Sequence, residues 1–174
     1  MRERGCFWLI FLWLTEKTDE FNNLETSFRY NRKKAYKQFC GKEDGMGEKV
    51  YITGINGFLG RTLAGKLLEA GCEVCGLRLL QDDRDLLTEV PYYTGDVSRL
   101  HTLVPFMKAA ARDDAVLIHC AGLVSITSDH PALWRVNVDG PRNVTDLCER
   151  YGIRKFIYVS SVHAIPEKTG GRTI

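Results

Sequence analysis

The amino-acid sequence predicts an α/β domain whose core is a doubly wound parallel sheet. From residue 46 onward, short β-prone apolar runs alternate with amphipathic helical segments, which is the pattern of strands joined by crossover helices. The first of these runs, Val50–Ile52, leads directly into a glycine-rich turn. The 174 residues are 44% hydrophobic and 26% charged, a composition typical of one domain with a sizeable core.

The glycine-rich turn is the strongest indication of function. Gly54 would form the tight turn after the strand, Gly57 would let backbone N–H groups approach a pyrophosphate, and Gly60 would let the next helix pack closely on the strand. That helix, predicted over residues 58–70, would direct its positive N-terminus at the phosphate. An ordinary loop is the alternative, but the strand before the turn and the helix after it favour a nucleotide site. The residues predicted to contact a cofactor here are Gly54, Asn56, Gly57, Phe58, Leu59 and Gly60.

The end of the second predicted strand, Glu73–Arg78, indicates which cofactor is bound. An acidic residue at this place holds the ribose 2′-hydroxyl of NAD, whereas an arginine can receive the 2′-phosphate of NADP. Arg78 occupies the place, and Asp82 follows several residues later. We therefore predict NADP rather than NAD, with a solvated loop arginine as the alternative interpretation.

Five stretches together resemble the extended short-chain dehydrogenase/reductase superfamily, in particular its NAD(P)-dependent epimerases, dehydratases and dihydroflavonol-reductase-like members. They are T-G-I-N-G-F-L-G at 53–60, G-D-V at 95–97, D-A-V-L-I-H-C-A-G at 114–122, N-V-D-G-P-R-N-V at 137–144 and V-S-S at 159–161. The resemblance implies a Rossmann-type doubly wound sheet. Pro141 stands where the family usually has threonine, and we expect it to kink a long helix predicted from Pro131 to Tyr151.

The resemblance also assigns roles to residues at the strand ends. Asp96, after a strand predicted at Val90–Thr94, would accept a hydrogen bond from the adenine amino group. It could equally be the N-cap of the helix predicted at 98–111. The small residues Ala121 and Gly122 would pass close to the cofactor ribose and diphosphate, and we interpret His119 as structural rather than catalytic. The other cofactor contacts implied by these motifs are Val97, Cys120 and Ser160.

Ser161 is the predicted catalytic residue, because the family's catalytic serine falls on the second of the pair that follows strand Lys155–Ser160. Its hydroxyl would hydrogen-bond the substrate oxygen as charge develops during hydride transfer. The family also uses a Tyr-x-x-x-Lys pair for proton transfer. Tyr151 and Lys155 have this spacing but precede the strand, away from the predicted cofactor site, so we interpret the match as coincidental. The expected pair would follow Ser161, beyond Ile174, so we predict a sheet truncated after its fifth strand and a chain inactive alone.

The predicted function is the cofactor-binding part of an NAD(P)-dependent oxidoreductase that transfers hydride between nicotinamide and a hydroxyl or carbonyl carbon. The alternative is a non-catalytic module that senses NADP(H) and presents a surface to a protein partner, although Ser161 favours the enzyme. For the complete protein we expect a small-molecule substrate and a homodimer, with no nucleic-acid or membrane partner.

Residues 1–45 do not fit the domain at 46–174 and are predicted to be an extension outside the family. The apolar run Gly5–Leu14 is shorter than the roughly 20 residues that span a bilayer. A signal peptide is the alternative, but no small-residue cleavage site follows. One hypothesis is that the natural start is Met46, because in a bacterial source the codons for Lys42–Asp44 can form a ribosome-binding sequence.

The six cysteines are scattered through the chain, which is typical of reduced thiols in a cytoplasmic protein. Cys72 and Cys75 have the spacing of a redox motif, but they lie at the entry to a predicted strand. No second pair completes a zinc site, so no metal is predicted.

Overall fold

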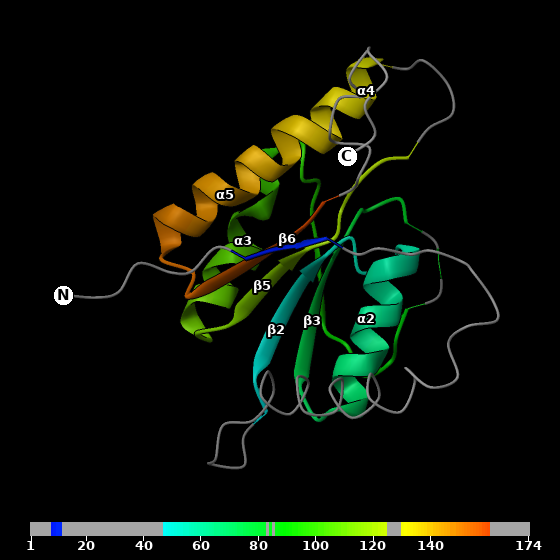
Figure 1. Ribbon diagram of the computed structural model, residues 1–174, viewed down its shortest axis with the longest axis vertical. Helices are drawn as coiled ribbons and strands as arrows, with labels where there is room; N and C mark the ends of the chain where they lie inside the picture. The colour runs from blue at the N-terminus through cyan, green and yellow to red at the C-terminus, as the bar shows by residue number, and fades with distance from the viewer. Residues whose placement is uncertain (1–7, 12–46, 83, 85, 125–129, 161–174) are drawn as a thin grey trace, which may run out of the picture.

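The computed structural model describes residues 8–11, 47–82, 84, 86–124 and 130–160, which form a parallel sheet flanked by helices (Figure 1). The strands are β1 (Trp8–Phe11), β2 (Lys49–Thr53), β3 (Glu73–Arg78), β4 (Tyr92–Thr94), β5 (Val116–His119) and β6 (Lys155–Ser160). The helices are α2 (Phe58–Glu69), α3 (Leu100–Arg112), α4 (His130–Trp134), the π-helix η1 (Arg135–Asp139) and α5 (Gly140–Tyr151).

The strand order β1-β6-β5-β2-β3-β4 confirms the predicted doubly wound sheet, and every pairing is parallel. From β2 the chain first proceeds outward through β3 to β4, and then returns to the other side of β2 for β5 and β6. The order therefore reverses between β2 and β5. In open α/β sheets, ligands bind beyond the carboxyl ends of the strands at such a reversal.

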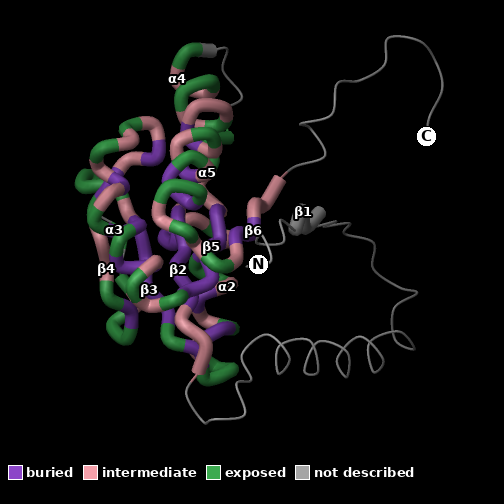
Figure 2. Tube along the Cα trace, turned by 90° about the vertical axis from the view of Figure 1, so that its left-hand side faces the viewer, coloured by how far each residue is buried: buried purple, intermediate pink, exposed green. Residues whose placement is uncertain are grey.

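Successive side chains of β2 point to opposite faces of the sheet, and the buried residues form two clusters, one on each face. Val50 and Ile52 pack with Ala64 and Leu67 of α2 on one face. Tyr51 packs on the opposite face, where the cluster draws on α3 and α5. Figure 2 shows the buried segments concentrated in the central strands, with exposed positions on the outer sides of the helices.

The predicted five strands of the 46–174 domain are present, with Lys155–Ser160 as the last described strand, and the sheet gains one more strand that was not predicted. Trp8–Phe11, from within the N-terminal extension, pairs with β6 in parallel, with Trp8 opposite Ile157 and Phe11 opposite Ser160. Without this pairing β6 would be an edge strand with unpaired backbone N–H and C=O groups. Pairing with Trp8–Phe11 gives these backbone groups of β6 hydrogen-bond partners.

Two element boundaries differ from the prediction because of proline. Strand β4 begins at Tyr92 rather than Val90, since Pro91 has no N–H to donate to a ladder, and its carbonyl instead accepts from Gly76 N–H at 2.9 Å. The single helix expected from Pro131 contains a π-helical turn, in which Gly140 N–H bonds to the Arg135 carbonyl. Pro141 follows directly, and it cannot donate the regular α-helical bond at that point. The expected kink is therefore a widened turn.

Cysteine chemistry agrees in part with the prediction. Cys75, Cys120 and Cys148 are free thiols, whereas Cys72 is disulfide-bonded, contrary to the expectation of reduced cysteines. Within the described part of the chain, every helix is too short or too polar to cross a lipid bilayer.

Candidate functional site

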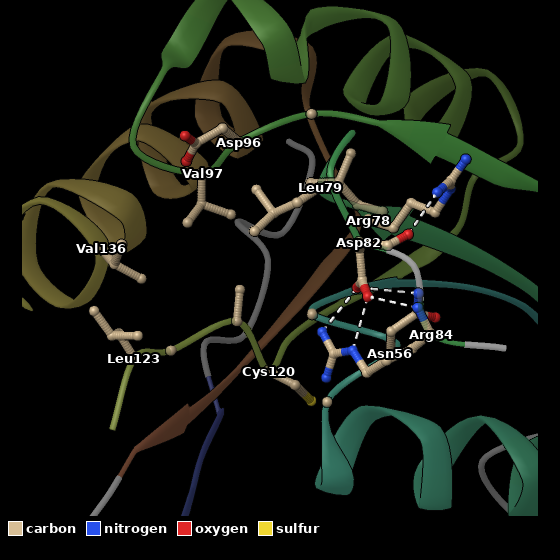
Figure 3. A pocket seen from close by; sticks show the side chains of 16 residues that line it. Asn56, Arg78, Leu79, Asp82, Arg84, Asp96, Val97, Cys120, Leu123 and Val136 are labelled. Carbon is tan, nitrogen blue, oxygen red and sulfur yellow. Dashed lines mark hydrogen bonds and ion pairs between the residues drawn. The ribbon is translucent and has the colours of Figure 1, made fainter. Parts of the chain in front are cut away.

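A pocket of about 230 Å³ opens at the carboxyl ends of β2, β3, β4 and β5, where the strand order reverses (Figure 3). Its walls come from the last two residues of β3, Leu77 and Arg78, from the turns that follow the four strands, and from one residue of η1, Val136. It brings together a large part of the predicted cofactor site. The predicted residues that line it are Gly54, Asn56, Gly57, Arg78, Asp96, Val97, Cys120, Ala121 and Gly122.

Gly54 lines the pocket at a point where two backbone segments meet. Its φ is +68°, in the left-handed region that favours glycine. A Cβ at this position would lie 2.6 Å from Ala121 Cα and 2.7 Å from Ala121 N. Gly57 N–H closes the turn on the Gly54 carbonyl at 3.0 Å. The turn after β2 therefore packs backbone to backbone against the turn after β5, and a side chain would force them apart.

Helix α2 begins at the edge of the pocket with its N-terminus open. Gly57 occupies the N-cap position in an extended conformation, no side chain caps the helix, and the first turn carries no acidic residue. The positive end of the helix dipole and the first N–H groups are thus available to an anion. Gly60 allows close packing here, because a methyl group on it would overlap the Gly54 carbonyl.

Asp96 stabilises the turn after β4 and lines the pocket. Its Oδ1 accepts from Ser98 N–H at 2.9 Å and from Ser98 Oγ at 2.7 Å. Helix α3 starts later, with Arg99 in the N-cap position, so Asp96 is not the cap of the helix itself. Its Oδ2 lies 3.8 Å from Arg99 Nε, an ion pair too long to be a hydrogen bond.

His119 is buried at the end of β5, beside the pocket rather than in it. Its Nδ1 lies 2.5 Å from Thr53 Oγ1, which also accepts from Ala121 N–H at 3.3 Å. The ring stacks on Tyr158 with centroids 5.6 Å apart. Burial lowers the pKa of His119 to about 4, so the ring is neutral at pH 7. If the threonine hydroxyl donates to Nδ1, the ring hydrogen is on Nε2, which has no partner among the described residues.

Two asparagines, Asn137 of η1 and Asn143 of α5, hold two walls of the pocket in place. Asn137 Oδ1 accepts from Leu123 N–H at 2.8 Å, and its Nδ2 donates to the Leu123 carbonyl at 2.8 Å. Asn143 Nδ2 donates to the Val97 carbonyl at 2.9 Å. Both Leu123 and Val97 line the pocket. The motif at 137–144 therefore acts on this site through backbone contacts, a role that sequence reasoning did not assign.

The end of the pocket beside β3 contains a polar cluster that the sequence indicated only in part. Arg78 Nη1 donates to the Asp82 carbonyl at 3.1 Å, so the predicted phosphate-binding arginine also fixes the following loop. The Asp82 carboxylate accepts from Arg84 and from Asn56 of the glycine-rich turn. These hydrogen bonds, Arg84 foremost, lower the pKa of Asp82 to about 2. Arg84 was not predicted, and its only signal is its place in the charged run 82–85.

Several predicted residues lie apart from the pocket lining. The Phe58 side chain is 85% exposed, and Leu59 and Gly60 follow it in α2. Ser160 is the last residue of β6, and the predicted catalytic Ser161 lies outside the described residues.

The Tyr-x-x-x-Lys spacing before β6 does not form a helical pair. Tyr151 is the last residue of α5 and Lys155 the first of β6, and Gly152 lies between them at a φ of +66°. Lys155 begins β6 at the end of the strand away from the pocket, and Tyr151 precedes it at the end of α5.

Comparison with known proteins gives matches over the same part of the chain. Residues 50–173 match the model of the NAD dependent epimerase/dehydratase family. A "Putative dihydroflavonol 4-reductase" of Synechocystis sp. is 33% identical over 132 residues, which are 73% of this chain and 36% of that protein. The 3 beta-hydroxysteroid dehydrogenase type 7 of Rattus norvegicus is 31% identical over 130 residues, 69% of this chain and 37% of that protein.

Among solved structures, the UDP-glucose 4-epimerase of Thermus thermophilus in complex with NAD is 25% identical, with a TM-score of 0.55. The match covers 71% of this chain and 42% of that one. The chain thus spans about a third of the length of the two curated relatives that it matches.

Proposed function

Because this chain belongs to the NAD dependent epimerase/dehydratase family, we propose that its pocket binds the adenosine diphosphate half of NAD(P). The observation that carries this proposal is the backbone contact between Gly54 and Ala121, next to the open N-terminus of α2. Together they form a narrow site with N–H donors and a positive dipole, which suits a pyrophosphate.

The residues around this site suit the rest of the nucleotide. Asp96 keeps one carboxylate oxygen free of hydrogen bonds shorter than 3.5 Å among the described residues, and this oxygen can accept from an adenine amino group. Arg78 lines the end of the pocket where the adenine ribose would lie, which supports NADP over NAD. Neutral His119 fixes Thr53, and through it the Ala121 backbone, so that the pyrophosphate site keeps its shape.

For the complete protein we propose an oxidoreductase of the reductase or epimerase/dehydratase type. A bound nicotinamide supplies or accepts a hydride at C4. Ser161 would hold the substrate oxygen through a hydrogen bond that strengthens as charge develops on that oxygen. We expect a small-molecule substrate, a homodimer and a cytoplasmic location.

The test of cofactor binding uses the chain as it stands. NADPH and NADH are titrated separately, and their binding is followed by nicotinamide fluorescence, with ADP-ribose as a competitor for the adenosine diphosphate site. We expect saturable binding that ADP-ribose reverses, with NADPH tighter than NADH. Tighter binding of NADH would reject the preference for NADP, and no saturable binding of either would reject the proposal.

The catalytic role is tested in a longer form of the protein. Ser161→Ala should lower kcat by about 10²–10³-fold, as expected for the loss of one oxyanion-hole donor, while leaving cofactor affinity unchanged. If the variant keeps its turnover, the role given to Ser161 is wrong. Cofactor binding with no turnover of any carbonyl or alcohol substrate would favour a non-catalytic NADP(H)-sensing module.

A further inference from the structure

Four hydrogen bonds converge on the Asp82 carboxylate at the ribose end of the pocket (Figure 3). Oδ1 accepts from Arg84 Nε at 2.7 Å and from Arg84 backbone N–H at 3.3 Å. Oδ2 accepts from Arg84 Nη2 at 2.8 Å and from Asn56 Nδ2 at 3.1 Å. The Asp82 side chain is only 6% exposed, whereas that of Arg84 is 55% exposed.

This arrangement leaves Asp82 no free acceptor position. A carboxylate offers about four lone-pair positions, and all four are used by Arg84 and Asn56. A ribose hydroxyl could bind Asp82 only by displacing one of these donors. Asp82 therefore differs from the free acidic residue that holds the ribose 2′-hydroxyl in an NAD site.

The guanidinium of Arg84, in contrast, can exchange its bonds to Asp82 for bonds to a phosphate. Its guanidinium donates through Nε and Nη2, two parallel donors that match either a carboxylate or a phosphate. The side chain lines the pocket and is more than half exposed, so a phosphate in the pocket can reach its guanidinium. Arg78 is less adaptable, because its guanidinium also fixes the loop through the Asp82 carbonyl.

We propose that the Asp82–Arg84 pair sets the choice between NADP(H) and NAD(H). This inference rests on the proposed function. Arg84 receives the 2′-phosphate, and Asp82 competes with that phosphate for the same guanidinium. When NADP(H) binds, Arg84 moves its two donors from Asp82 to the phosphate, and Asp82 keeps its bond to Asn56. When NAD(H) binds, Arg84 keeps both side-chain hydrogen bonds to Asp82.

Substitutions of the two partners should have opposite effects on one cofactor and none on the other. Asp82→Asn removes a negative charge that both holds Arg84 and would repel the phosphate. The amide oxygen of the new side chain can still accept the hydrogen bond from Asn56. We expect NADPH to bind about three- to tenfold more tightly to this variant. Arg84→Gln removes the receiving group, so NADPH should bind about tenfold more weakly. The Kd for NADH should change less than about twofold in both.

The experiment measures Kd for NADPH and NADH by nicotinamide fluorescence for the wild type, Asp82→Asn and Arg84→Gln. Lys108→Gln is the control, since it removes the same charge from an exposed position on α3 outside the pocket lining. It should change neither Kd. Arg84→Lys keeps the charge but loses the paired donors, and it should recover only part of the NADPH affinity.

The possible failures can be told apart. If the affinities for NADPH and NADH fall together in both variants, the pair only supports the loop and the inference is wrong. Weaker NADH binding by Asp82→Asn alone would instead make Asp82 a ribose acceptor. A wild type that binds neither cofactor overturns the proposed function as well. Far-UV circular dichroism checks folding, and Arg84→Gln, at an exposed side chain, still decides the matter if Asp82→Asn does not fold.

Discussion

Gly54→Ala tests the physical basis of the pocket. Alanine in the left-handed region costs about 1–2 kcal/mol relative to glycine. Its Cβ would also lie 2.6 Å from Ala121 Cα, inside van der Waals contact with backbone that cannot rotate away. Forced overpacking of this kind costs about 1–3 kcal/mol more. We therefore expect the free energy of unfolding to fall by about 2–5 kcal/mol.

The same substitution should weaken cofactor binding, because the turn after β2 and the turn after β5 must separate. Loss of a single hydrogen bond to a charged phosphate costs about 1.5–3 kcal/mol, which raises Kd tenfold or more. Urea unfolding measures the stability change, with an expected decrease in midpoint of about 1 M or more. Titration with NADPH below that midpoint measures the affinity.

Gly65→Ala is the matched control for Gly54→Ala. Gly65 lies inside α2, and no atom outside the helix lies within 4 Å of an added Cβ. Alanine there should stabilise the chain by about 0.5–1 kcal/mol and leave the affinity for NADPH unchanged. The reasoning is refuted if Gly54→Ala keeps the wild-type midpoint and Kd, or if both variants lose stability equally.

Two further predictions concern His119 and Asn137. The pKa of His119 is about 4 in the folded chain, below its ordinary value of 6.5. As the pH falls, the imidazole is therefore protonated in the unfolded chain before it is protonated in the folded one. The free energy of unfolding should decrease by about 3 kcal/mol between pH 6.5 and 4. Urea titrations should lose this decrease in His119→Gln and retain it in His101→Gln, an exposed histidine on α3, whereas the same slope in both would contradict the assignment. Asn137→Ala removes both bonds to the Leu123 backbone and should cost about 1–2 kcal/mol, with faster hydrogen exchange at the Leu123 amide as the measurement. Unchanged exchange there would mean that Asn137 does not hold this wall.

The sequence alone determined the features that depend on local physics. A short β-prone run followed by spaced glycines and an amphipathic helix predicted β2, the turn at Gly54 and α2, since each requirement concerns neighbouring residues. The resemblance placed the small residues after β5 close to the cofactor ribose and diphosphate, and the structure brings Ala121 against Gly54 at the pocket. Hydrophobic periodicity and glycine spacing were sufficient for β2, its turn and α2.

Only the tertiary structure decided which side chains complete the pocket. Asn56, Asp82 and Arg84 come from two turns on either side of α2 and β3, and the irregular run 82–85 has no period from which their meeting could be predicted. Asn137 reaches Leu123 through a π-helical turn that sequence reasoning expected only as a kink at Pro141. Similarly, Trp8–Phe11 pairs with β6 because that edge had unpaired backbone groups, a condition set by the assembled sheet and not by the apolar run itself.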